Sequence, residues 1–329
     1  MASSKGIALV NLDEDGVDRA FRADVLQGLS EAQKAIPARW LYDDAGSQLF
    51  EDITRLPEYY PTRSEREILE ACGAEFADLI GPDRAVVEFG SGSSVKTPLL
   101  LSAIDPAAYV PLDISGDFLR ASSAELSAKF PGLPVYPVEA DFMRRVELPT
   151  EVAGMPKLGF FPGSTIGNMV ARTAVDLLRT MRETLGEGSK LLIGMDLIKE
   201  RKVLIAAYDD AAGVTAEFNL NLIRRIIREL DADIPFDALQ HVARWNDEFA
   251  RIEMHLVATR DLQFTVSGKP FGMREGESIH TENSHKFNRR TGNTLLLAGG
   301  WTPVQRWTDS EERFSLVLAN ATIPRSAPQ

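Results

Sequence analysis

Residues 84–96 read RAVVEFGSGSSVK, an apolar run that ends at two closely spaced glycines. The apolar, β-branched residues at 84–89 predict a buried strand. Gly90 and Gly92 then let the backbone turn tightly, and they let a ligand approach the start of the following helix without a Cβ in the way. This stretch therefore predicts the first strand, turn and helix of a nucleotide-binding sheet.

The alternation of short apolar runs with helical segments continues to about residue 198. Further strands are expected at 109–113, 135–140, 157–161 and 190–195, with helices for instance at 116–129 and 171–185. Strands that alternate with helices indicate a parallel sheet connected by crossover helices. We therefore expect an α/β fold built on a doubly wound, Rossmann-like sheet.

The pattern changes after residue 198. Apolar residues recur at helical spacing from Phe218 to Leu230, which predicts an amphipathic helix. Residues 252–256 and 262–266 alternate apolar and polar side chains around a short turn, which predicts a two-stranded antiparallel hairpin. Because a hairpin does not belong in a parallel sheet, residues 199–287 are expected to form an inserted α+β unit.

Two further strands are expected near the end of the chain, at 300–307 and 313–319. Both have the β-branched and aromatic composition that is typical of strands. They follow the inserted unit, so we expect them to return to the edge of the main sheet.

The composition limits the classes of function. The chain has 48 acidic and 36 basic residues and a formal charge of −12, which repels phosphate backbones and argues against a nucleic-acid substrate. A signal peptide and an apolar run of about 18 residues are both missing, so we expect a cytoplasmic protein that spans no membrane. The single cysteine and the four histidines show no metal-ligand spacing, and no metal is expected.

Asp113 is a candidate ligand for the ribose of a nucleoside. Asp113 ends the second expected strand, where it can accept hydrogen bonds from both ribose hydroxyls. The dinucleotide fingerprint requires a third glycine where this chain has Val95, and Glu88 would repel a pyrophosphate. These departures disfavour a nicotinamide-dependent oxidoreductase, and the pattern resembles that of the class I S-adenosylmethionine-dependent methyltransferases.

Asp141 and Phe142 follow the third expected strand. In a methyltransferase they would accept the adenine amino group and lie against its ring. Taken alone, they have a simpler interpretation as a helix cap and a core phenylalanine.

Longer stretches carry a more specific resemblance over nearly the whole chain. They read WLYDDAGSQLF (40–50), TRLPEYYPTR (54–63), PGSTIGN (162–168), AYDDAAGVTAEFN (207–219), RIEM (251–254) and TENSHKF (281–287). With these runs the chain resembles the histidine-specific Nα-methyltransferases of the ergothioneine pathway. The resemblance implies S-adenosylmethionine as cofactor, free L-histidine as substrate and hercynine, the trimethylated amino acid, as product.

The resemblance also implies the site residues. The cofactor would be held by residues at Gly90, Lys96, Asp113, Asp141 and Phe142. The amino acid would be held by Tyr59, Asn168, Tyr208, Glu282 and Ser284, with Met254 beside its ring. Tyr59 and Asn168 would lie nearest the reacting amino group and are the candidate catalytic residues.

A two-part architecture follows from the same resemblance. Residues 66–198 and 288–329 would form the cofactor-binding methyltransferase domain. Residues 12–65 and 199–287 would form the inserted α+β substrate-binding domain. We expect a monomer that acts on a small molecule.

Two other functions stay open at this point. A related enzyme could methylate a tryptophan-like amine, although Glu282 and Ser284 favour imidazole. The chain could instead be a regulator that binds S-adenosylmethionine without turnover. Individually, each of these site residues also has a structural interpretation, such as a turn for Tyr59, a helix cap for Asn168 or a core position for Tyr208 and Met254.

Overall fold

A computed structural model of the chain describes residues 12–92 and 96–322. Val95, which bears on the glycine fingerprint, lies outside these residues. The described chain divides into two compact units: one holds the residues up to Tyr60 together with Lys199–His285, and the other holds Pro61–Ile198 together with the residues from Lys286 onward. Among the described helices, none has both the length and the apolar character needed to cross a bilayer.

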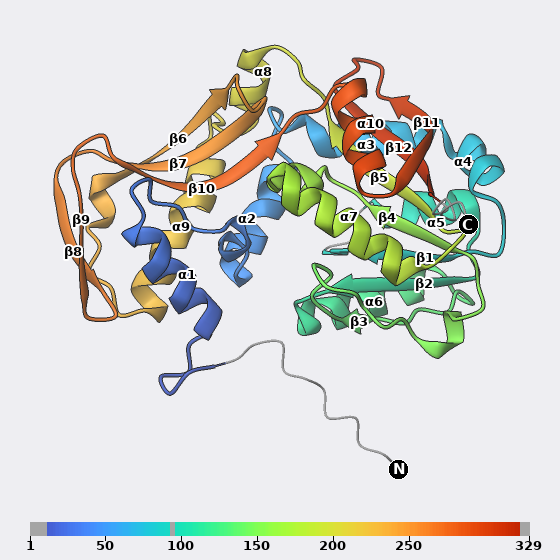
Figure 1. Ribbon diagram of the computed structural model, residues 1–329, viewed down its shortest axis with the longest axis horizontal. Helices are drawn as coiled ribbons and strands as arrows, with labels where there is room; N and C mark the ends of the chain where they lie inside the picture. Colours follow the sequence, from blue (N-terminus) through green and yellow to red (C-terminus); the bar gives the residue numbers. More distant parts are fainter. Residues whose placement is uncertain (1–11, 93–95, 323–329) are drawn as a thin grey trace, which may run out of the picture. The chain divides into compact units, whose positions relative to one another are not determined.

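The second unit is built on a seven-stranded sheet (Figure 1). In chain order its strands are β1 (Ala85–Phe89), β2 (Ala108–Asp113), β3 (Val138–Glu139), β4 (Lys157–Phe161), β5 (Lys190–Asp196), β11 (Trp301–Thr308) and β12 (Phe314–Ala321). The spatial order is β11-β12-β5-β4-β1-β2-β3. Strands β1 to β5 pair in parallel, whereas β12 is antiparallel to β5 and to β11. The expected return of the last two strands to the sheet edge is therefore confirmed.

Helices cover both faces of this sheet. They are α3 (Tyr60–Ala71), α4 (Gly73–Ile80), α5 (Thr97–Ile104), α6 (Gly116–Lys129), α7 (Ala171–Leu185) and α10 (Arg289–Ala298), with 3₁₀ helices η2 (Thr150–Val152) and η3 (Thr165–Asn168). Neighbouring strand residues enter different cores: Val87 packs in a cluster with residues of α7 and α10, and Val86 packs in a cluster with residues of α4 and α5. Burial on both faces explains why the strands read as continuous apolar runs, and it confirms the doubly wound α/β fold.

The third strand is shorter than expected. The Tyr109 amide donates to the Pro134 carbonyl and the Tyr109 carbonyl accepts the Tyr136 amide, but Pro111, the next residue of β2 that faces this edge, has no N–H to continue the ladder. Regular pairing with β2 therefore covers only Val138 and Glu139.

The first unit combines helices with two small sheets. Its helices are α1 (Arg19–Ser30), α2 (Asp44–Thr54), α8 (Arg201–Ala206) and α9 (Val214–Glu229), with 3₁₀ helices η1 (Ala38–Leu41) and η4 (Phe236–Ala238). Its strands are β6 (Leu239–Asn246), β7 (Arg251–Ala258), β8 (Leu262–Val266), β9 (Lys269–Met273) and β10 (Ser278–His285). α9 packs on β6 and β7, and α2 packs on α9 (Figure 1).

The prediction that residues 252–256 and 262–266 pair in a hairpin is wrong. β7 is the central strand of a three-stranded antiparallel sheet, β10-β7-β6, whereas β8 pairs with β9 in a separate sheet. Both strands exist where the alternation placed them. Alternation reveals which face of a strand is buried but not which strand lies beside it.

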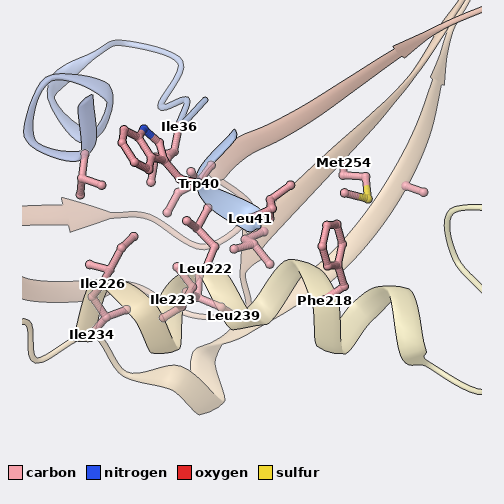
Figure 2. Close-up of a cluster of buried hydrophobic side chains, with 14 of the residues drawn as sticks. Ile36, Trp40, Leu41, Phe218, Leu222, Ile223, Ile226, Ile234, Leu239 and Met254 are labelled. Atoms are coloured by element: carbon pink, nitrogen blue, oxygen red, sulfur yellow. The ribbon is translucent and has the colours of Figure 1, made fainter. Parts of the chain in front are cut away.

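The core of the first unit forms where α9 meets these strands (Figure 2). Phe218, Leu222, Ile223 and Ile226 on α9 are buried together with Leu239 and Met254 from the sheet. The helical spacing of apolar residues from Phe218 to Leu230 therefore corresponds to a real buried face.

Two of the three boundaries between the units fall a few residues earlier than the sequence suggested. The first unit ends at Tyr60 instead of 65 and, after the insertion, at His285 instead of 287. Two contacts explain the difference: the Glu65 carboxylate accepts the Gly163 amide, and the Lys286 ammonium pairs with Asp196 at 2.7 Å, both within the second unit.

Candidate active site

The glycine turn lies at the carboxyl end of β1. Gly90 and Gly92 have φ of +72° and +47°, in the left-handed region that favours glycine. The Gly92 amide donates to one carboxylate oxygen of Asp113 at 3.0 Å, and the Ser115 amide donates to the other at 3.0 Å. The turn and the end of β2 are thereby held together.

Phe142 closes over the same turn. A Cβ added to Gly90 would lie 3.2 Å from the Phe142 ring, so the ring would have to shift by a few tenths of an ångström to admit any other residue. The ring makes edge contacts with Phe89 and Phe161 at centroid distances of 6.4 and 6.0 Å. Neighbouring Asp141 accepts the Met143 amide at 3.0 Å.

These residues, Gly90, Gly92, Asp113, Asp141 and Phe142, are called the glycine-turn cluster. They combine a tight backbone turn, two carboxylates and an aromatic ring at the carboxyl ends of parallel strands. Such an edge is where open α/β sheets bind nucleotides. The cluster therefore fits a nucleoside cofactor, with Asp113 toward a ribose and Phe142 toward a base.

Glu88 is a structural carboxyl group beneath the turn. It is 1% exposed and accepts hydrogen bonds from the Tyr109 hydroxyl at 2.6 Å and the Thr97 hydroxyl at 2.7 Å. Burial raises the pKa of Glu88 to about 7, although these hydrogen bonds and Lys96 act in the opposite direction. At neutral pH the group is partly protonated.

Lys96, a candidate cofactor ligand, has a partner that the sequence did not suggest. Its ammonium forms an ion pair with Glu65 of α3, whose side chain is fully buried. Both Glu65 oxygens also lie within 3.1 Å of the Gly163 amide. Lys96 and Glu65 therefore hold the loop that follows β4.

That loop carries Asn168, the last residue of η3. Gly163 and Ser164 have φ of +76° and +59°, and the Ser164 hydroxyl accepts the Asp196 amide at 2.9 Å. Asn168 is half-buried at the end of this braced segment.

The substrate candidates of the first unit gather on β10 and around it. Glu282 and Ser284 alternate along β10, so their side chains share one face of the sheet, and they are 7% and 3% exposed. The Ser284 hydroxyl lies 2.7 Å from the Tyr208 hydroxyl. The Tyr208 ring meets that of Tyr59 edge-on at 6.3 Å.

A β-bulge sets the orientation of Glu282. The register with β7 shifts between His280 and Glu282, and Glu282 then lies opposite Met254. The Thr281 hydroxyl donates to the Met254 carbonyl at 3.1 Å at the bulge. Met254 itself is 1% exposed and belongs to the hydrophobic core of the unit (Figure 2).

Tyr42 completes the group, although it was not singled out from the sequence. Its ring makes edge contacts with Phe50 and Phe218 at 5.5 and 5.3 Å. The residue is 38% exposed, yet burial of its hydroxyl raises the pKa of Tyr42, as do the nearby Glu282, Tyr59 and Tyr208. The phenol thus remains a hydrogen-bond donor. Its place within the distinctive WLYDDAGSQLF run was the available signal.

Tyr42, Tyr59, Tyr208, Glu282 and Ser284 are called the tyrosine–glutamate cluster. It offers one carboxylate and four hydroxyl groups with aromatic walls. A carboxylate beside a hydroxyl can accept and exchange hydrogen bonds with a ring that carries two nitrogens, such as imidazole. The arrangement suits a small polar amino acid better than a wholly apolar one.

Three possible metal ligands also come close together in the first unit. Side-chain ligand atoms of Glu253, His255 and His280 lie within 4.8 Å of one another. However, the two imidazole rings are stacked, with an interplanar angle of 16°, and Arg251 holds the Glu253 carboxylate at 2.6 Å. Stacked rings do not point their in-plane lone pairs at one ion, so this geometry does not suit a metal.

The sheet order and the glycine-turn cluster define a class I methyltransferase fold, a class that uses S-adenosylmethionine. A family model described as "Histidine-specific methyltransferase, SAM-dependent" matches residues 21–321. The chain belongs to this family of enzymes.

Relatives support the assignment. The chain is 41% identical to the Histidine N-alpha-methyltransferase of Mycolicibacterium smegmatis over 95% of this chain and 99% of that protein. It is 40% identical to the enzyme of the same name from Mycobacterium tuberculosis over 94% and 97%. It is also 30% identical to the Ergothioneine biosynthesis protein 1 of Neurospora crassa, over 89% of this chain and 34% of that longer protein.

Proposed function

We propose that the protein transfers three methyl groups from S-adenosylmethionine to the α-amino nitrogen of free L-histidine, giving hercynine for ergothioneine biosynthesis. The observation that carries this proposal is the tyrosine–glutamate cluster, in which buried Glu282 and Ser284 share one face of β10. The names of the relatives at about 40% identity support it.

The imidazole ring of the substrate is assigned to three side chains of the first unit. Glu282 accepts one ring N–H, and Ser284 bonds the other ring nitrogen. A substrate that lacks these nitrogens would leave a buried carboxylate without its partner, which a polar pocket of this kind penalises by up to about 10⁴ in relative rate. Met254, in the core opposite Glu282, is assigned contact with the flat face of the ring.

The amino-acid end is assigned to three further side chains. Tyr208 and Asn168 hold the substrate carboxylate, and Tyr59 and Asn168 orient the α-amino group. The phenol of Tyr42, kept protonated by its surroundings, supplies one more donor for the carboxylate.

The cofactor is assigned to the glycine-turn cluster and Lys96. Asp113 accepts the ribose hydroxyls, Asp141 accepts the adenine amino group, and Phe142 lies against the adenine. When bound, S-adenosylmethionine supplies an electrophilic methyl group on a positively charged sulfur. The chain's own contribution is to orient the amine lone pair and to exclude water, because an amine held in line for attack reacts far faster than a free one.

The direct experiment is mass spectrometry of L-histidine incubated with purified protein and S-adenosylmethionine. Products with one, two and three added methyl groups are expected on the α-nitrogen, with trimethylated histidine accumulating. Tryptophan in a parallel incubation tests the alternative substrate. S-adenosylmethionine binding without formation of S-adenosylhomocysteine would instead identify a regulator and contradict the proposal.

Two properties accompany this proposal. A small-molecule methyltransferase needs no partner chain to form either cluster described above, so we propose that the enzyme works as a monomer in the cytoplasm. Sedimentation of the purified protein and fractionation of cells test these two points.

A further inference from the structure

His241, on β6, is a buried side chain that the proposed reaction does not use. It is 6% exposed. Its Nε2 lies 2.8 Å from the backbone carbonyl of Tyr208, and its Nδ1 lies 2.9 Å from the side-chain nitrogen of Asn219. Both ring nitrogens therefore have partners, and one partner is a residue of the tyrosine–glutamate cluster.

The surroundings fix which ring nitrogen carries the proton. The Asn219 nitrogen also lies 3.3 Å from the His255 carbonyl, which orients the amide with its N–H groups toward both acceptors. Because an amide nitrogen only donates, His241 Nδ1 accepts. The ring proton is thus on Nε2, and it is donated to the Tyr208 carbonyl.

The ring is also held in its neutral form. Burial lowers the pKa of His241, although the Tyr208 hydrogen bond and the nearby Asp209 and Asp210 act in the opposite direction. Protonation of Nδ1 would set an N–H against the N–H of Asn219. A neutral ring with one donor and one acceptor matches both partners.

Tyr208 lies where such support matters. It follows the short helix α8 in a turn, and its amide donates to the Ile205 carbonyl at 2.9 Å. Two residues later, Asp210 caps α9 by accepting the Val214 and Thr215 amides at 3.0 and 2.8 Å. His241 holds the Tyr208 carbonyl from the neighbouring strand, so the peptide between two helices is fixed from a second direction.

We infer that His241 is a positioning residue, which holds the Tyr208 backbone so that its hydroxyl meets both Ser284 and the substrate carboxylate. This inference rests on the proposed function for the identity of the substrate. It assigns to His241 a role in histidine affinity without any contact with histidine.

Two substitutions separate the roles of the two ring nitrogens. In His241→Gln the side-chain amide nitrogen reaches the place of Nε2–H and can donate to the Tyr208 carbonyl. In His241→Asn the shorter side chain keeps only the partner on Asn219. Gln240→Asn, at an exposed position on the same strand, is the matched control for loss of one methylene.

The expected result is a selective loss of histidine affinity. His241→Asn should raise KM for histidine about 10-fold, as expected for one lost hydrogen bond, with kcat and KM for S-adenosylmethionine within about 2-fold of wild type. His241→Gln should restore most of the affinity. Equal effects of the two variants, or an equal loss for both substrates, would overturn the inference.

A double-mutant cycle of His241→Asn with Tyr208→Phe distinguishes positioning of Tyr208 from a general effect on stability. Once the hydroxyl is removed, misplacing the ring costs less, so His241→Asn should change KM for histidine less in the Tyr208→Phe background than in wild type. The same fold-change in both backgrounds would mean that His241 acts on stability alone, and the inference would fail.

A measurement independent of turnover separates this inference from the proposed function. Long-range ¹H–¹⁵N spectra of protein labelled in its histidines, assigned with His241→Gln, should show His241 as the neutral tautomer with the proton on Nε2. That result supports the assignment even if the substrate proves to be another amine. A proton on Nδ1, or a charged ring at neutral pH, would contradict it even if histidine is methylated.

Discussion

The hydroxyl of Tyr208 lies 2.7 Å from the hydroxyl of Ser284, although the two residues are 76 positions apart in the chain. The bond joins the turn after α8 to strand β10. It also links the side chain assigned to the substrate carboxylate with one assigned to the imidazole. The two ends of the proposed histidine site are therefore not independent.

The first prediction follows from this link. Ser284→Ala and Tyr208→Phe should each raise KM for histidine, and the double variant should cost less than the sum, because either change already breaks the shared bond. The coupling should be about 1 kcal/mol. Steady-state kinetics of the four proteins measure it, and strictly additive effects would argue against the link.

Glu282→Ala should reduce kcat/KM for histidine by about 100-fold, because a charge-assisted hydrogen bond to the ring is lost. The dissociation constant for S-adenosylmethionine, measured by calorimetry, should stay near the wild-type value. Glu275→Ala, at an exposed position before β10, is the control. Equal damage to the binding of both ligands would refute the role of Glu282.

Gly90→Ala should weaken cofactor binding more than it weakens the fold. The new Cβ would meet Phe142 at 3.2 Å, at a residue with φ of +72°. Gly188→Ala is a matched control, because φ is +71° and no atom lies within 4 Å. Both variants should lose about 1–2 kcal/mol of unfolding free energy from backbone strain. Only Gly90→Ala should show a large rise in the dissociation constant for S-adenosylmethionine.

Glu88 should make the stability depend on pH. Its pKa in the folded protein is about 7, raised by burial from an ordinary value of 4.5, so the folded state binds more protons than the unfolded state between these values. The stabilisation is fully present below about pH 4.5 and is lost as the pH rises through 7, a loss of about 3 kcal/mol.

Urea unfolding of wild type and Glu88→Gln at pH 5 and pH 8 tests this. The amide does not titrate, so the variant should lose less stability than wild type over this interval. Parallel losses in the two proteins would show that Glu88 does not titrate there.

Treatment with a chelator should leave the methylation rate unchanged. Of the three possible ligands, Glu253 is held by Arg251 and lies 3.3 Å from His255, and the rings of His255 and His280 are stacked. The rate should be compared before and after dialysis against EDTA, with added zinc as a second arm. A loss that zinc restores would reveal a metal requirement.

Much of the sheet could be predicted because its signals are local. The strand at 157–161 and the helices at 116–129 and 171–185 have the expected bounds. Their apolar spacing and the flanking glycines and prolines act within a few residues. Where a single residue interrupts hydrogen bonding, as Pro111 of β2 does beside β3, the expected strand was too long.

The pairing of strands and side chains that are distant in the sequence could not be predicted in this way. The alternation in β7 and β8 was correct, but their partners are β10, β6 and β9, and nothing local encodes this. The ion pair of Lys96 with Glu65 and the hydrogen bond of His241 to Tyr208 are likewise contacts between distant segments. The site residues themselves came from the family resemblance, and their individual roles stay predictions.

The bulge at Thr281 has a consequence for the parity of strand β10. Ile279 lies opposite Leu256, and Glu282 lies opposite Met254. Ile279 and Glu282 are three positions apart and share one face of the sheet, whereas in a regular strand residues three apart lie on opposite faces. An uninterrupted strand with Ile279 in the core would turn Thr281 and Asn283 toward the site, and Glu282 and Ser284 away from it. The substrate specificity of the enzyme therefore depends on the position of this one-residue bulge in β10 as much as on the chemistry of Glu282 and Ser284.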